Sequence, residues 1–177
     1  IKNDFKLQYV ATPVDAMQML ILRRADHALL AEPAISIALR KTGSFPVKLI
    51  APDLYRSINL QEEWGRLYKI EAKIPQAGLA IIGDTNGKEE LISKVLAEYD
   101  KSLAWYKNNK EEASKLVVKT LPMLEEKGLA DSIEYVRFEN ISAIKSKKDL
   151  EFFFDILMQN DSKLIGGKLP NEDFYYK

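Results

Sequence analysis

The stretch KLQYVATPVDAMQMLILRRADHALLAEPAISIAL, residues 6–39, decides which fold the sequence predicts. Around its start, Phe5, Leu7 and Tyr9 alternate with polar residues, which is typical of a half-buried β-strand. The segment HALLA (residues 27–31) is a continuous apolar run, as in a parallel strand that is covered on both faces. A segment of helical periodicity lies between them. The stretch therefore predicts a strand, helix, strand unit with a right-handed crossover in a parallel sheet.

The helix starts in this stretch carry local signals. Thr12 offers a side-chain cap, Pro13 suits the first helical position, and Asp15 completes a capping box. Glu32 stands where the second strand is expected to end, and a further helix is expected to begin at Pro33 and to end at Gly43. In an open α/β sheet, ligands bind at the carboxyl ends of strands, beside helix N-termini. The same stretch thus predicts a site at Glu32.

The remaining chain changes character near residue 75. VKLIA (residues 47–51) and PQAGLAIIG (residues 75–83) are short apolar runs that predict two more strands, and residues 52–73 predict loop and short helix. From about residue 87 onward, apolar side chains recur at helical spacing, and Ser146 with Asp149 has the spacing of a capping box. Helices are therefore expected through most of this part.

The predicted fold class is α/β, a parallel-sheet lobe followed by a helix-rich segment. Residues 1–74 are expected to form part of the sheet lobe, with Glu32 and Pro33 at the edge of a cleft. Residues 75–177 are expected to form a return strand and the helix-rich part of another lobe.

Composition narrows the function classes. The 26 basic and 26 acidic residues cancel, so no global attraction to nucleic acid or anionic lipid is expected. No cysteine is present, which excludes disulfides, thiol catalysis and cysteine metal sites. His27 is the only histidine and is expected to be structural, because one histidine without cysteine does not build a common zinc site. Neither a metal nor a cofactor is expected.

The order and spacing of several motifs resemble the second lobe of substrate-binding proteins of ABC transporters, in the group that serves nitrate, sulfonates, taurine and thiamine precursors. That group has a type II periplasmic-binding-protein fold. PQAGLAIIG resembles the return strand of these proteins, and SLAWYKNNKEEASKLV (residues 102–117) resembles their long first-lobe helix. The family's chains are longer, so this chain resembles a C-terminal portion. The individual residues that match are Thr12, Pro13, Asp15, Ala16, Asp26, Ala28, Glu32 and Pro33.

The resemblance implies a solute receptor without catalytic activity. Such a protein binds a small organic molecule or anion between two lobes and delivers it to a membrane permease, outside the cytoplasm or lipid-anchored at the cell surface. Two alternatives stay open. One is an enzyme on the same fold, like the pyrimidine-precursor synthases of thiamine biosynthesis, although those use histidines and a cysteine-rich motif. The other is a helical interaction module, which would show an exposed apolar groove and no polar cleft near Glu32.

Each candidate ligand contact has a structural alternative. Glu32 could accept hydrogen bonds from ligand or stabilise the next helix through its macrodipole. Thr12 could hold an anionic group, although simple capping is the better interpretation. Gln76 could face the hinge or a surface turn. Aromatic residues could stack on ligand or form core. Because half of the expected cleft lies outside this chain, self-association of the fragment is also expected. The candidate ligand-binding residues are Glu32, Thr12, Gln76, Ala31, Tyr55 and Trp64.

Overall fold

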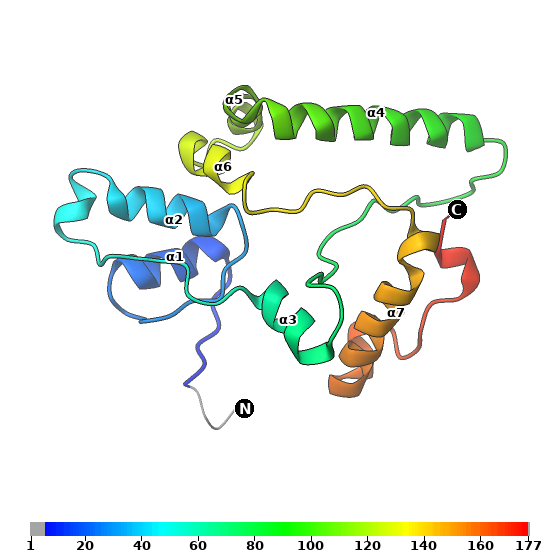
Figure 1. The fold of residues 1–177 in the computed structure, drawn as a ribbon, viewed down its shortest axis with the longest axis horizontal. Coiled ribbons are helices and arrows are strands. Elements are labelled where there is room, and N and C mark those ends of the chain that lie inside the picture. The colour runs from blue at the N-terminus through cyan, green and yellow to red at the C-terminus, as the bar shows by residue number, and fades with distance from the viewer. Residues whose placement is uncertain (1–5, 177) are drawn as a thin grey trace. The chain divides into compact units, whose positions relative to one another are not determined.

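The computed structural model describes residues 6–176 and shows an all-helical chain (Figure 1). The described residues contain no β-strand. The elements follow in the order α1 (Pro13–Ile21), α2 (Ala34–Gly43), η1 (Val47–Leu49), α3 (Leu60–Tyr68), α4 (Glu89–Asn108), α5 (Lys110–Thr120), α6 (Glu126–Ser132), α7 (Ala143–Asn160), η2 (Ser162–Ile165) and η3 (Glu172–Phe174), where η is a 3-10 helix.

The predicted parallel sheet is therefore wrong, and so is the α/β fold class. Of the four expected strands, residues 47–51 contain the 3-10 helix η1, and the other three are irregular over their described residues. Phe5, which was expected in the first of them, lies outside the described residues. A strand requires a hydrogen-bonded neighbour, and none of these segments has one. A type II periplasmic-binding-protein fold needs a parallel sheet, so the resemblance to ABC-transporter receptors is contradicted as well.

Several predicted helix boundaries are confirmed because they depend on local chemistry. The Thr12 hydroxyl accepts a hydrogen bond from the backbone N–H of Asp15 at 3.1 Å, and the Asp15 carboxylate accepts one from the N–H of Thr12 at 3.0 Å. This capping box opens α1. The helix expected from Pro33 to Gly43 is α2, but the capping box expected at Ser146 is wrong, because α7 already begins at Ala143.

Contacts divide the described chain into two units, each built from two segments. Unit 1 comprises residues 6–57 and 95–138, and unit 2 comprises residues 58–94 and 139–176. The expected division into residues 1–74 and 75–177 stays a prediction.

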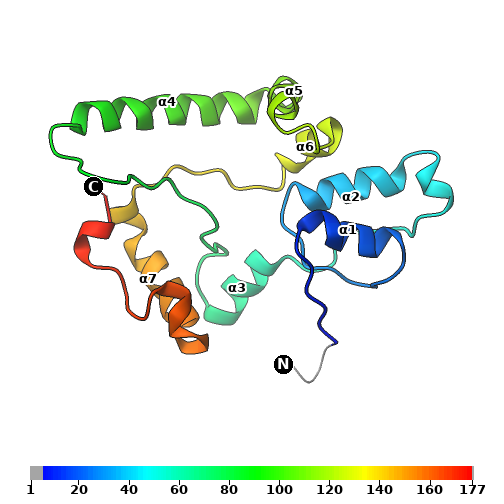
Figure 2. The same cartoon turned by 180° about the vertical axis from the view of Figure 1, so that it is seen from behind.

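Unit 1 is held together by contacts among α1, α2, α5 and α6. Both views show α1 beside α2 (Figures 1 and 2). Met17, Ile37 and Ala38 are buried between these helices. At Gly128, α6 approaches α2 so closely that an added Cβ would lie 2.7 Å from the Cα of Ile37. The small core of unit 1 thus depends on a glycine at a helix crossing.

Unit 2 contains a cluster of aromatic rings between α3 and α7. Trp64 lies edge-on to Phe152 and Phe153, with ring centroids 5.8 and 5.9 Å apart. Tyr68 lies 4.6 Å from Trp64 and 5.2 Å from Phe152. Edge-to-face pairs of this kind add to the apolar area that the rings bury, so the cluster stabilises the pairing of α3 with α7.

Candidate functional site

Glu32, the leading candidate from the sequence, lies just before α2 and is engaged by the protein itself. Its carboxylate accepts a hydrogen bond from the backbone N–H of Ser36 at 3.1 Å and one from the Arg56 guanidinium at 2.6 Å. The Glu32 side chain is only 8% exposed. A buried carboxylate needs such partners, because removal from water is costly for a charge. Glu32 therefore stabilises the start of α2.

Arg56 joins three segments of unit 1. Besides Glu32, it donates a hydrogen bond to the hydroxyl of Ser36 at 2.8 Å. Its guanidinium carbon lies 3.6 Å from the ring centroid of Tyr135, close enough for a cation–π interaction. The Arg56 guanidinium thus holds together the loop before α3, the start of α2 and the segment after α6.

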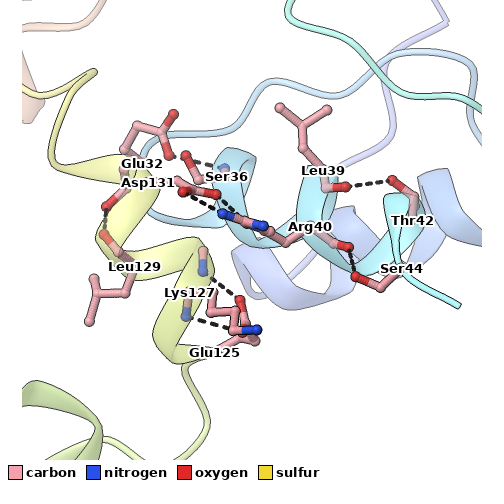
Figure 3. Close-up of polar contacts among 12 residues, drawn as sticks. Glu32, Ser36, Leu39, Arg40, Thr42, Ser44, Glu125, Lys127, Leu129 and Asp131 are labelled. Atoms are coloured by element: carbon pink, nitrogen blue, oxygen red, sulfur yellow. Dashed lines mark hydrogen bonds and ion pairs between the residues drawn. The ribbon is translucent and has the colours of Figure 1, made fainter. Parts of the chain in front are cut away.

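A second ion pair joins α2 to α6. The Arg40 guanidinium donates to both carboxylate oxygens of Asp131, through Nε and through Nη2, and the Nη2–Oδ1 distance is 2.8 Å. Figure 3 shows the two side chains reaching toward each other across the two helices. The hydrogen bonds from Arg40 hold the pKa of Asp131 below its ordinary value. Charge-assisted bidentate pairs are strong and directional, so this pair sets the register of α6 on α2.

The lowered pKa of Asp131 predicts a pH-dependent contribution to stability. The unfolded carboxylate has a pKa near 3.8, and folding lowers this value. The Arg40–Asp131 pair therefore stabilises the fold fully above the unfolded pKa and loses its effect as pH falls through the lower, folded pKa. We expect the difference in unfolding free energy between the wild type and Asp131→Asn to be constant from about pH 7 to 5 and to shrink below about pH 4. Urea titrations at several pH values measure it, and a difference that does not change with pH would contradict the assignment.

These ion pairs flank a polar pocket of about 460 Å³ in unit 1. Its charged groups already have partners: Arg40 has Asp131, Arg56 has Glu32, and Glu134 has Lys110. A charged ligand would have to displace one of these pairs, so the pocket does not by itself indicate a function. Its lining residues are Ser36, Leu39, Arg40, Gly43, Ser44, Arg56, Asp131, Glu134 and Tyr135.

The other candidate residues belong to both units. Thr12 is engaged by Asp15, Ala31 is exposed, and Tyr55 is 79% exposed in unit 1. Gln76 and Trp64 belong to unit 2, where Gln76 is exposed and Trp64 packs among aromatic rings. The ligand contacts of all six residues stay predictions.

The described chain offers no other obvious chemical site. No three His, Cys, Asp or Glu side chains among residues 6–176 come together in a way that could hold a metal ion. No helix in this range is both long and apolar enough to cross a membrane.

The feature that sequence reasoning missed is the uncovered side of α4. The sequence places apolar residues at helical spacing there, which is the signal of a buried face. At 100° per residue, the apolar positions of α4 span about half of the helix circumference. This arc is wider than packing against a single neighbouring element requires. Leu96 and Leu103, which belong to unit 1, are half-buried and lie on one edge of this arc.

The other edge of the arc is more exposed, and we term it the α4 stripe. It consists of Val95, Tyr99, Ser102, Trp105 and Tyr106. Val95 is 55% exposed, Tyr99 38% and Trp105 43%, whereas Tyr106 is half-buried and packs edge-on against Phe138 at 5.3 Å. Within unit 1, no other helix packs against α4, and none of the helices of this unit runs along α4 in either view (Figures 1 and 2).

Comparison with known proteins adds no candidate to these observations. The chain matches no family model, no curated protein and no solved structure.

Proposed function

We propose that the chain is a helical protein-interaction module that docks an amphipathic helix on the α4 stripe. The observation that carries the proposal is the exposure of apolar residues on the part of α4 that belongs to unit 1, against which no other helix of this unit packs. An amphipathic helix in this position would bury its own apolar side chains at matching i, i+4 and i+7 positions.

The alternatives have less support. The helical-module hypothesis expected an exposed apolar groove and no polar cleft near Glu32. Exposed apolar side chains are present, and Glu32 is bound by Arg56 and Ser36. A polar pocket lined by Ser36 and Arg56 lies beside this pair, so the second expectation is not met. Solute binding, delivery to a permease and an extracytoplasmic location stay predictions, as does the absence of catalytic activity.

A designed peptide tests the proposal. The probe is a fluorescent amphipathic helix with leucines at the stripe's spacing and uncharged polar residues elsewhere. We expect it to bind the wild type, and we expect Val95→Gln with Tyr99→Gln to weaken binding at least about tenfold, because apolar contact area is lost. Fluorescence anisotropy measures the affinity.

Two matched variants control this experiment. Leu79→Gln with Ile82→Gln changes exposed apolar residues of unit 2, which are 60% and 96% exposed; equal weakening by this variant would mean non-specific adhesion. Leu96→Gln with Leu103→Gln changes the half-buried edge and should lower the unfolding free energy by about 2 kcal/mol. The stripe variant should change it by no more than about 0.5 kcal/mol. A stripe variant as unstable as the edge variant would show that the stripe is covered within the chain.

A further inference from the structure

The C-terminal segment of unit 2, residues 171–176, lies beside the start of α7 (Figures 1 and 2). Tyr175 is 3% exposed and is the only buried residue of this segment, whereas residues 171–174 are exposed. Gly166 and Gly167 have positive φ and let the chain turn back before the segment begins. A segment with so little buried surface opens more readily than the helix on which it lies.

Lys147 of α7 is at the centre of the polar contacts with this segment. Its amine pairs with the Glu172 carboxylate and lies 3.8 Å from the carboxylate of Glu151. It also lies 5.2 Å from the ring centroid of Tyr175, within range of a cation–π interaction. The Tyr175 hydroxyl donates a hydrogen bond to Glu151 at 3.3 Å. The hydrogen bond with Glu172 raises the pKa of Lys147, so the docked segment lowers the fraction of the amine that is neutral and nucleophilic.

A backbone contact joins the same segment to the first turn of α7. Ile144 is the second residue of this helix, where a backbone N–H has no partner within the helix. In the folded chain, the N–H of Ile144 donates a hydrogen bond to the carbonyl of Tyr176 at 3.3 Å. The amide of Ile144 is therefore protected from water only while the segment is docked.

We infer that residues 171–176 form a strap that opens while α7 stays folded, and that the strap thereby controls access to the Lys147 amine. Tyr175 anchors the strap, because its ring supplies the buried apolar contact area. Lys147 clamps the strap through Glu172. Opening separates the amine from Glu172 and exposes the N–H of Ile144 to water. This inference concerns unit 2 alone and does not depend on the α4 stripe.

Hydrogen exchange of single amides in the full-length chain, followed by NMR, tests the strap. In the wild type, the Ile144 amide should exchange at least about tenfold more slowly than an unprotected amide and at least about tenfold faster than the amide of Phe153 in the middle of α7. Tyr175→Ala should raise the Ile144 rate at least about tenfold, with Phe153 still at least about tenfold slower than Ile144. Tyr175→Phe keeps the ring and should stay within about threefold of the wild type.

The reactivity of the Lys147 amine provides the second readout. A small acetylating reagent is added to the full-length chain, and mass spectrometry follows each lysine. Lys147 should react at least about fivefold more slowly than its exposed neighbour Lys148 in the wild type, and within about twofold of it in Tyr175→Ala. Removal of the clamp by Lys147→Gln should raise the Ile144 exchange rate about threefold, whereas Lys148→Gln removes the same charge and should leave it unchanged.

Several results would overturn the strap. An Ile144 amide that exchanges as fast as an unprotected one would show that the segment is not docked. Equal exchange rates for Ile144 and Phe153 in the wild type would show that the segment opens only when α7 unfolds. Equal acetylation of Lys147 and Lys148 in the wild type would show that the segment does not restrict the amine. Circular dichroism checks that each variant is helical, and if Tyr175→Ala lost its helices, the comparison of Lys147→Gln with Lys148→Gln would decide.

Discussion

Replacing Gly128 by alanine should lower the free energy of unfolding by about 3 kcal/mol. The added Cβ would lie 2.7 Å from the Cα of Ile37, 2.9 Å from its Cγ1 and 2.9 Å from a carboxylate oxygen of Glu125. Backbone atoms cannot move aside as the end of a flexible side chain can, so α6 would have to shift away from α2. In a helix without such a contact, alanine would be more favourable than glycine by about 1 kcal/mol. A net loss of stability would therefore come from the close contact between α6 and α2.

The matched control is Gly43→Ala in the same unit. Gly43 is the last residue of α2, and no atom lies within 4 Å of a Cβ added there. This variant should match the wild type or gain up to about 1 kcal/mol. Urea unfolding followed by circular dichroism compares the three proteins. Gly128→Ala with wild-type stability would mean that α2 and α6 do not cross this closely in solution.

Glu32→Gln should lower the unfolding free energy by about 2 kcal/mol. The substitution keeps the side chain's shape and removes the charge that balances Arg56, whose side chain is only 32% exposed. Arg56 would keep its contacts with Ser36 and Tyr135 but lose its ion-pair partner. Removing one member of a mostly buried pair leaves an uncompensated charge, which is why the loss exceeds that of a surface pair.

The same chemical change at an exposed pair is the control. Glu63 and Arg66 form an i, i+3 pair on α3, with side chains 45% and 72% exposed. Glu63→Gln should leave the stability unchanged within error, because water screens such pairs. The double variant Glu32→Gln with Arg56→Gln should recover part of the loss, and the double-mutant cycle isolates the interaction. If Glu32→Gln and Glu63→Gln had equal effects, Glu32 would be exposed in solution and open to a ligand.

Local chemistry made some parts of the fold predictable. The capping box at Thr12 and Asp15 and the helix that ends at Gly43 involve residues within a few positions of one another, so the sequence displays the whole interaction. The short apolar runs were misjudged for the opposite reason. A run such as HALLA suits a strand only if another strand lies beside it, and the run itself does not reveal whether one does. In the structure it is irregular, and Leu29 is 79% exposed.

The candidate sites show the same division. The position of Glu32 at a helix start was predictable, because Pro33 follows it directly. Its partner Arg56 lies 24 residues away in the sequence, and Arg40 and Asp131 lie 91 residues apart. No local pattern links such residues, so neither ion pair was predicted, and the polar pocket between them was not predicted either.

The amino-acid sequence by itself determined the capped helix starts and the wide apolar arc of α4, because caps and helical periodicity depend on residues close together in the chain. Only the tertiary structure decided that no sheet forms among the described residues, that Glu32 is engaged by Arg56, and that Leu96 and Leu103 are half-buried while Val95 and Trp105 are exposed. Each of those outcomes depends on which distant segment supplies the neighbouring atoms. Burial and charge pairing are properties of that neighbourhood rather than of any single segment.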